Sequence, residues 1–332
     1  MIPLPYSRAG GHSKLLLIAA AWGLTSCVAW CLDKDAQSPP SHPVSREARS
    51  AFPELNRLID ANQLQQAETE LRQRVASGGE NYKTLYYQAL ILFKQGQFSQ
   101  SLKTLERSFV TQKYDPDLYF LAGLDWVALN RIKLAVPFYM AAAQLAPTDF
   151  QMHYHLGRAY YTDQQFEKAE REFRRVLELN PTFVKGYDNL GLALEALGEE
   201  AAAIESYRKA IDLNEQQRQG NEWPYINLAE FLIKKNRFDD ALELAQKATI
   251  LNPRSAEAYF ALGEALNKKG KEQEAVKALN IAAQNDPQYS KPHYLLGQIY
   301  RKLGLLEEAK RELLTFQELN RTEKQNKPSG GG

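Results

Sequence analysis

The feature that most constrains this chain is a 34-residue unit between Phe150 and Phe183. Its first part places a bulky residue, a leucine–glycine pair and an aromatic residue on one face of an α-helix: His153, Leu156, Gly157 and Tyr160. A polar break follows, and then a second apolar helix face: Ala169, Phe173 and Val176. Asn180-Pro181 ends the second helix, because proline cannot donate to the helix ladder. Neither short helix can bury its apolar face alone, so the unit requires copies of itself.

Copies of this unit run along most of the chain. We place their starts at Ala48, Tyr82, Pro116, Phe150, Val184, Glu222, Ala256 and Ser290. The spacing is 34 residues except between Val184 and Glu222, where it is 38. Four extra residues, 218–221, are close to one helical turn, so they indicate either a longer second helix or a bulged loop. We interpret them as a tolerated surface insertion or as a binding feature beside Trp223.

This pattern closely resembles the tetratricopeptide repeat family. In that family a bulky residue, leucine–glycine, an aromatic residue, an alanine, a second aromatic residue and a closing proline recur. The resemblance covers residues 48–323. It implies an all-α fold, a right-handed α-solenoid or superhelix of helix–turn–helix units, whose first and second helices we call helix A and helix B. Because each unit packs on its neighbours, an array of this kind needs no single large core.

Small residues mark the place where helices A and B of one unit cross. In five of seven units helix A carries glycine there, as at Gly157, which faces Ala169 in helix B. A glycine inside a helix costs about 1 kcal/mol relative to alanine, so close packing must outweigh that cost. The turn positions of the array suit a left-handed helix end: Gly96, Asn130, Gly198, Asn236, Gly270 and Gly304.

Residues 1–35 are expected to be an export segment outside the array. Arg8, His12 and Lys14 precede an apolar run over 15–32, which is typical of a secretory signal or a signal-anchor. The positive flank predicts that the residues after this run lie on the extracytoplasmic side of a membrane. The stretch before and including Cys27 also resembles the lipobox of bacterial lipoproteins, in which the cysteine is acylated.

Three forms of this N-terminal segment stay open: a lipoprotein lipidated at Cys27, an uncleaved anchor and a cleaved soluble form. All three export the array. Residues 36–47 are expected to form a flexible, proline-bearing linker. At the other end, the last helix is expected to end near Leu319, with a polar, disordered tail over 324–332.

The sequence contains little that predicts catalysis. The net charge of +1 argues against a dedicated nucleic-acid binder. We find no phosphate loop, no paired nucleophile and no cofactor motif, and the acidic pairs at the starts of helices B complement the helix dipole. His153 and His155 point to different sides of a helix and form no metal pair, and His153 fills a core position. The sequence therefore predicts neither an enzyme nor a cofactor or metal site.

The resemblance implies that helix A lines the concave side of the array and meets ligands there. The fifth residues of the repeats are mostly aromatic, and with neighbouring positions they give the candidate partner-binding residues: Tyr86, Phe120, Tyr154, Arg158, Asn189, Trp223, Asn227, Phe260 and Tyr294. The rings form either a groove for an extended peptide or partner helix, or packing against the adjacent helix. Asp188 and Leu192 stand where the lysine–asparagine carboxylate clamp of some family members would need other residues, so no clamp is expected.

We therefore predict a non-catalytic protein–protein interaction scaffold. Its partners would be other proteins, bound as an extended peptide or a helix, and the membrane, through the N-terminal anchor or lipid. On this interpretation it would assemble an envelope complex on the extracytoplasmic, periplasmic side. The alternatives are a substrate adaptor or regulatory subunit of a separate enzyme, and a homo-oligomeric structural element.

The first prediction concerns Cys27. If the lipobox interpretation is correct, Cys27→Ser abolishes acylation, whereas an uncleaved anchor is indifferent to the change. Mass spectrometry of the mature N-terminus, with and without the substitution, checks this. An intact Met1 on the membrane-bound protein would contradict the lipoprotein form.

Overall fold

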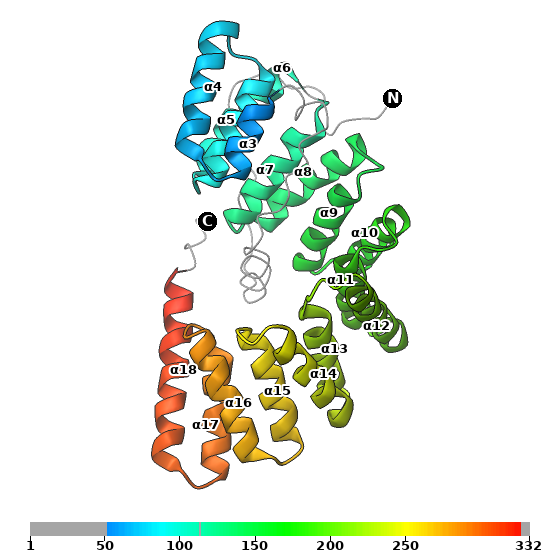
Figure 1. Ribbon diagram of the computed structural model, residues 1–332, viewed down its shortest axis with the longest axis vertical. Helices are drawn as coiled ribbons and strands as arrows, with labels where there is room; N and C mark the ends of the chain where they lie inside the picture. The colour runs from blue at the N-terminus through cyan, green and yellow to red at the C-terminus, as the bar shows by residue number, and fades with distance from the viewer. Residues whose placement is uncertain (1–51, 113, 327–332) are drawn as a thin grey trace.

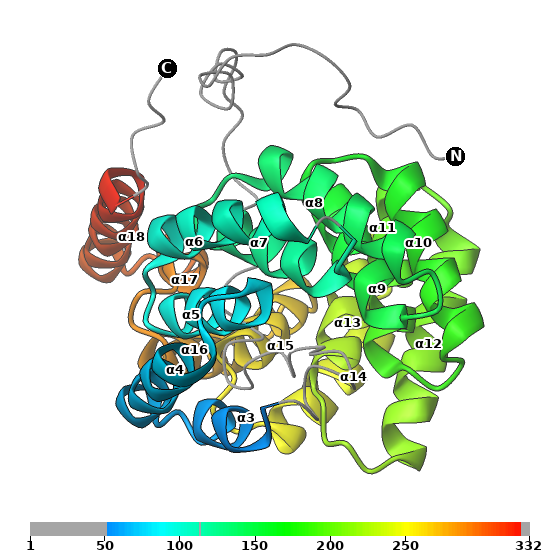
Figure 2. The same cartoon turned by 90° about the horizontal axis from the view of Figure 1, so that it is seen from above.

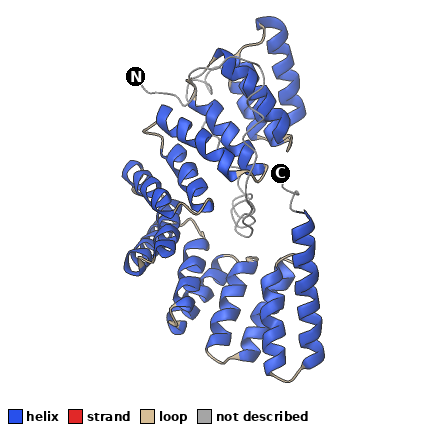
Figure 3. Cartoon of the chain, turned by 180° about the vertical axis from the view of Figure 1, so that it is seen from behind, coloured by secondary structure: helices blue, strands red, loops and turns tan. Residues whose placement is uncertain are grey.

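The computed structural model describes residues 52–112 and 114–326. Within these ranges the chain is all helical, with no strand, so the predicted fold class is confirmed (Figure 1, Figure 3). The helices are α3 (Pro53–Asp60), α4 (Leu64–Gly78), α5 (Tyr82–Lys94), α6 (Phe98–Thr111), α7 (Pro116–Ala128), α8 (Ile132–Leu145), α9 (Phe150–Thr162), α10 (Phe166–Leu179), α11 (Val184–Leu197), α12 (Glu200–Gln216), α13 (Trp223–Lys234), α14 (Phe238–Leu251), α15 (Ala256–Lys268), α16 (Glu272–Asn285), α17 (Ser290–Lys302) and α18 (Leu306–Asn326). The expected export segment, linker and Cys27 lie outside the described residues.

The odd-numbered helices are helices A and the even-numbered ones helices B, packed in chain order (Figure 1). Each helix B contacts its own helix A and the helix A that follows. Consecutive helices A also contact each other, as α11 does α13 and α13 does α15, and no consecutive pair of described helices B is in comparable contact. Helices A therefore line the inner side of the curve that the array follows (Figure 2).

The glycine of helix A leaves the space that an aromatic ring or a leucine of helix B occupies. A Cβ on Gly191 would lie 2.6 Å from the Tyr207 ring, and one on Gly157 would lie 2.7 Å from the Phe173 ring. A Cβ on Gly263 would also approach the Ala275 carbonyl oxygen at 3.3 Å. The crossing is as tight as its small residues predict, although the nearest atoms belong to the residue sixteen positions after the glycine rather than to the alanine.

The left-handed turn positions are found where the sequence places them. All six have positive φ, from 60° at Asn130 to 79° at Gly198 and Gly304. Gln164 also has a φ of 59°, although glutamine gives no sequence signal for it. At each of these turns the backbone N–H groups that follow the helix bond to its last carbonyls, as Gln165 does to Tyr160.

The four-residue insertion lengthens both the helix and the loop. α12 has 17 residues where most other helices B have 14. The Asn214 side chain then holds the loop: its amide donates to the Asn221 carbonyl (2.8 Å) and its oxygen accepts from the Asn221 N–H (3.1 Å). Asn214 is buried, and it corresponds to Asn180, which comes directly before the proline that ends the helix in its repeat. Here the Asn214 side chain holds the end of the helix and no proline follows it.

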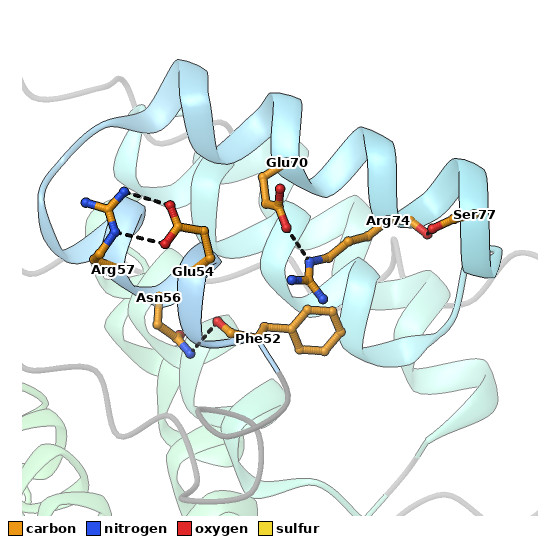
Figure 4. Close-up of polar contacts among 7 residues, drawn as sticks. All are labelled: Phe52, Glu54, Asn56, Arg57, Glu70, Arg74 and Ser77. Atoms are coloured by element: carbon orange, nitrogen blue, oxygen red, sulfur yellow. Dashed lines mark hydrogen bonds and ion pairs between the residues drawn. The ribbon is translucent and has the colours of Figure 1, made fainter.

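The two ends of the array differ from each other. At the N-terminal end the first repeat departs from the pattern: Pro53 opens α3, and the buried Leu55 takes the place of a small residue. Ion pairs and hydrogen bonds cover its outer surface (Figure 4). At the C-terminal end α18 continues to Asn326, past the expected end near Leu319 and into residues expected to form the tail. None of the described helices combines the length and apolar content that a bilayer crossing needs.

One acid is buried between two repeats. Asp125 of α7 is fully buried, and the Ser101 hydroxyl of α6 donates to it at 2.6 Å. Its second carboxylate oxygen has no partner within the described chain. Burial raises the pKa of Asp125 to about 8, although the hydrogen bond from Ser101 opposes that shift. At neutral pH this carboxyl is therefore largely protonated in the folded state.

The tight crossing gives a direct stability test. Gly191→Leu forces a large side chain into the Tyr207 ring, and overpacking of this kind costs about 1–3 kcal/mol of unfolding free energy. Lys209→Ala, on an exposed face of α12, should change it by less than about 0.5 kcal/mol. Urea denaturation midpoints of the two variants check this. Equal midpoints would show that the crossing is misplaced.

The buried acid predicts how stability depends on pH. In the unfolded chain Asp125 ionises near 3.8, whereas in the folded chain it holds its proton up to about pH 8. The unfolding free energy should therefore fall as pH rises through this window. Asp125→Asn removes that titration and should leave the variant more stable than the parent by at least about 1 kcal/mol at pH 8. Thermal melts from pH 5 to pH 9 measure the effect, and parallel curves for both proteins would contradict it.

Candidate functional site: the inner surface of helices A

The fifth-position rings are packing residues in this structure. In the seven repeats from Tyr82 onward, six of the fifth-position side chains are at most 9% exposed: Tyr86, Phe120, Tyr154, Asp188, Ile226 and Phe260. The exception is Tyr294, which is 46% exposed in the last repeat. Neighbouring helices A contribute to this burial, as where Phe120 lies against His155 of α9. The expectation of an exposed aromatic groove thus gives way to its alternative, packing against the adjacent helix.

Ring-to-ring contacts show how this packing runs from repeat to repeat. Phe120 lies against His155 of the next helix A at 4.8 Å, and His155 lies against Tyr154 at 5.5 Å. Tyr154 in turn meets Phe183, which precedes α11, edge-on at 5.1 Å. Edge-to-face contacts at these separations are favourable. They lock the relative positions of three consecutive helices A.

Two predicted residues, Arg158 and Asn189, lie against the side chain of a third, Tyr154. The Arg158 guanidinium lies 5.7 Å from the centre of the Tyr154 ring, within the range of a cation–π contact. The Asn189 amide donates to the Lys185 carbonyl at 2.9 Å and reaches the Tyr154 hydroxyl at 3.5 Å. Arg158 and Asn189 are half-buried, so this cluster presents a cation and an amide to the inner surface.

Asn227 and Trp223 have other surroundings. The Asn227 amide nitrogen donates to both carboxylate oxygens of Asp188, each at 3.0 Å, and both residues are buried. Asn227 is therefore committed to joining α11 and α13. Trp223 begins α13 and is half-buried, and the Asn221 side chain accepts its backbone N–H at 3.1 Å.

A second polar cluster, which the sequence analysis did not select, spans α11, α13 and α15. It consists of Glu195, Glu230, Lys234 and Glu264, and we call it the glutamate cluster. The Lys234 ammonium donates to Glu195 at 2.7 Å. Glu230 and Glu264, at the ninth positions of consecutive repeats, are half-buried and have no hydrogen bond or ion pair to a described residue. The repeat positions alone could have identified these residues, because the ninth and thirteenth residues of a repeat also face the ligand in proteins of this type.

The surroundings shift the ionisation of the glutamate cluster. Burial and the nearby charge of Glu230 raise the pKa of Glu264, while Lys268, Lys291 and Lys234 oppose that shift. Burial lowers the pKa of Lys234, but the hydrogen bond to Glu195 and its charge outweigh this and raise it overall. Glu264 is thus a carboxylate that would gain from a donor or a cation brought by a partner.

This inner surface offers recognition groups rather than reactive ones. Its side chains can donate hydrogen bonds, accept them and pair with charges on a bound chain. His153, the predicted core histidine, bonds to Glu172 through Nδ1 at 2.7 Å, and His293 repeats this contact with Glu312. Within the described residues no group of three or more histidine, cysteine, aspartate or glutamate side chains could hold a metal ion.

The fold defines a helical repeat protein whose helices A line the inner side of its curve. Comparison with protein families gives the family: a model of the tetratricopeptide repeat matches residues 120–183, 154–218 and 227–290, and a second such model matches 290–323. The chain belongs to the tetratricopeptide repeat family. The matches pass over residues 219–226, which include most of the insertion at 218–221.

Curated relatives match part of their length. The chain is 25% identical over 172 residues to anaphase-promoting complex subunit CDC16 of Saccharomyces cerevisiae, which covers 50% of this chain and 20% of that protein. It is 28% identical over 130 residues to the BBSome complex member BBS4 of Bos taurus, covering 39% and 25%. It is 26% identical over 185 residues to the human protein O-mannosyl-transferase TMTC3, covering 51% and 20%. The chain thus spans a quarter or less of these relatives' length.

Among solved structures, the APC/C hetero-tetramer Cut9–Hcn1 has a similar fold. The TM-score is 0.58 at 14% sequence identity, over 77% of this chain and 50% of that one. At this identity the likeness shows the shared α-solenoid fold alone.

The burial of the fifth-position rings predicts that their removal lowers the unfolding free energy. Phe120→Ala and Tyr154→Ala should each lower the unfolding free energy by about 3–5 kcal/mol, because each leaves a cavity among packed rings. Tyr294→Ala, an exposed ring at the same repeat position, should cost much less. Chemical denaturation of the three variants measures this, and similar losses for all three would contradict the packing role.

Proposed function

We propose that this chain is a non-catalytic scaffold that binds another protein along its inner surface. The observation that carries the proposal is the run of half-buried polar groups on consecutive helices A: Arg158, Asn189, Glu230 and Glu264. Two of them, Glu230 and Glu264, have no hydrogen bond or ion pair to a described residue, although lysine charges lie nearby. Partly desolvated carboxylates that accept no hydrogen bond are costly, and a bound chain that supplies donors relieves that cost.

The form of the partner follows from the form of the surface. Polar groups repeat once per helix A along a curved path, which suits an extended segment or a helix laid across several repeats. Two relatives are named as members of multisubunit complexes, the anaphase-promoting complex and the BBSome. These names support assembly of a complex as the role of the array.

The proposal extends to location. The positive flank, the apolar run and Cys27 support a scaffold tethered at a membrane and working on its extracytoplasmic side in an envelope complex. This part depends on residues outside the described chain and is tested separately by the N-terminal mass of the mature protein.

A second candidate is a substrate adaptor or regulatory subunit of a separate enzyme. The specific support is the relative named a protein O-mannosyl-transferase, one fifth of which this chain covers. In that case the chain would bind a catalytic polypeptide or its substrate. The same inner surface would serve, so the identity of the bound chain separates the two candidates.

Charge reversal on the inner surface tests the proposed function. Glu230→Lys with Glu264→Lys should weaken partner capture at least about tenfold, since it opposes the cations or donors that the carboxylates would accept. The matched control reverses two exposed outward charges of α12, Arg208→Glu with Lys209→Glu, and should leave capture intact. Cross-linking mass spectrometry should place the partner beside inner lysines such as Lys234 and Lys268. Loss of the partner with the α12 variant alone would contradict the proposal.

A further inference from the structure

The last repeat exposes apolar side chains that the first repeat does not. Of the eleven large apolar side chains that are strongly exposed in the described chain, five lie here: Tyr294, Leu303, Leu305, Leu306 and Leu314. None lies in α3 or α4. At that N-terminal end Arg57 pairs with Glu54 at 2.6 Å and Arg74 with Glu70 at 2.7 Å (Figure 4). The two ends of the array therefore differ in chemistry.

Two of these exposed side chains, Leu306 and Leu314, line an open hollow of about 300 Å³ on α17 and α18. Its apolar wall consists of Leu306, Leu313 and Leu314 of α18. Its charged side chains are both cations, Arg301 and Lys310, and neither has a hydrogen bond or ion pair to a described residue. An apolar wall with two unpaired cations favours an apolar occupant that carries a carboxylate.

Contacts inside the array show what such a wall holds. Helix B meets the following helix A through a fixed set of repeat positions. The twentieth residue meets the tenth, as Ser101 bonds to Asp125 at 2.6 Å, and the twenty-fourth also meets the tenth, as the Tyr207 ring lies 6.3 Å from Phe231. The twenty-eighth meets the fourth, as the Phe109 ring lies 4.8 Å from Tyr119.

Ion pairs extend the same pattern to the other end of the helix. A lysine at the thirteenth or fourteenth residue of helix A pairs with an acid at the seventeenth or eighteenth residue of the preceding helix B, three times in succession: Lys235 with Glu200, Lys269 with Asp239, and Lys302 with Glu272. Since late residues of helix B meet early residues of helix A, the incoming helix runs antiparallel to helix B.

The hollow on α18 is formed by these same positions. Leu306, Leu313 and Gln317 are the seventeenth, twenty-fourth and twenty-eighth residues of the last repeat. Leu313 packs beneath Gly297 on one side and is only half-buried, whereas its equivalents Phe173 and Tyr207 are fully buried. The hollow is therefore the seat of a helix A.

We propose that this seat binds an amphipathic helix of another protein, antiparallel to α18, with a carboxylate in its last turn. The apolar stripe of this helix covers Leu313 and Leu314. Inside the array Lys234, a thirteenth residue, donates to Glu195, the twelfth residue of the preceding repeat. In the same way, the carboxylate of the bound helix meets Arg301, the twelfth residue of the last repeat. A lysine one residue later faces Glu307, which is exposed and has the place of Asp239.

The chemistry of the seat distinguishes this occupant from an ordinary repeat helix. At the twenty-first position five of the six internal repeats carry apolar residues, such as Val136, Leu242 and Val276, and the sixth carries Glu170, whereas the last repeat carries the cation Lys310. A second copy of the chain fits poorly, because two such seats face to face would bring the cations Arg301 and Lys310 of both copies into one interface. The described N-terminal end offers no exposed apolar face to complement it.

The experiment uses the full chain and two fluorescent peptides, held helical by a staple on the outward face. The first has the sequence of residues 256–269, which forms α15 and its next residue. The second carries Lys268→Glu, so that a carboxylate stands at the thirteenth position before Lys269. Fluorescence anisotropy should show saturable one-to-one binding, with the second peptide about tenfold tighter than the first. Arg301→Glu should reverse that order.

Two substitutions on the rim separate binding from folding. Leu306→Asp and Leu314→Asp alter side chains that are 65% and 48% exposed, so the fold tolerates them, yet each should weaken the second peptide about tenfold. Ile250→Asp, at a 76% exposed site on α14, is the matched control and should have no effect. Absence of saturable binding, equal loss with the control, or an unchanged peptide order in Arg301→Glu overturns the proposal. So does a dimer in sedimentation that Leu314→Asp dissociates, because a second copy would then cover the seat.

Discussion

The close approach of helix A to helix B within each repeat is the contact on which the rest of the structure depends. It exists because an eighth-position glycine leaves room for a ring or a leucine sixteen residues later, as Gly123 does for Tyr139 and Gly297 for Leu313. A Cβ at either place would lie within 2.7 Å of that side chain. The helical propensity lost at glycine, about 1 kcal/mol, is small beside the burial of a whole ring. Each hairpin thereby becomes a rigid unit that can stack on the next.

Stacking then decides which side chains remain for recognition. The curve of the array brings consecutive helices A into contact, so fifth-position residues such as Phe120 and Tyr154 become part of the core. On the proposed function, recognition falls to the ninth, twelfth and thirteenth positions, which lie further along each helix A. There the side chains differ between repeats, from Arg158 to Glu230 and Glu264. The same backbone thus presents a cation in one repeat and carboxylates in others.

The sequence was sufficient to predict those features that depend on one residue type at one position of the repeat. Gly198 and Asn130 predict left-handed turns, and the small residues Gly157 and Ala169 predict a tight crossing, although the sequence did not predict that the ring against Gly157 is Phe173. It was insufficient where the outcome depends on neighbouring repeats. The sequence pattern allows Phe120 to be either a groove residue or a core residue. The contact with His155 of the next repeat shows that it is a core residue. Likewise, no local signal shows that the Asn227 amide is occupied by Asp188, or that α18 continues to Asn326.

The ends of the array show what the repeat pattern itself leaves open. An internal helix B has two neighbours, and its twenty-fourth residue is fully buried whether it is Phe173, Tyr207 or Leu279. At the N-terminal end a short α3 suffices, because Phe52 packs on the Tyr87 ring at 5.0 Å and Arg74 lies over Phe52 at 5.1 Å. At the C-terminal end Phe316 packs on Tyr294 at 5.0 Å and covers the inner edge of the last repeat. That ring reaches only one side of α18, so the leucines on its other side keep the geometry of an interface between repeats.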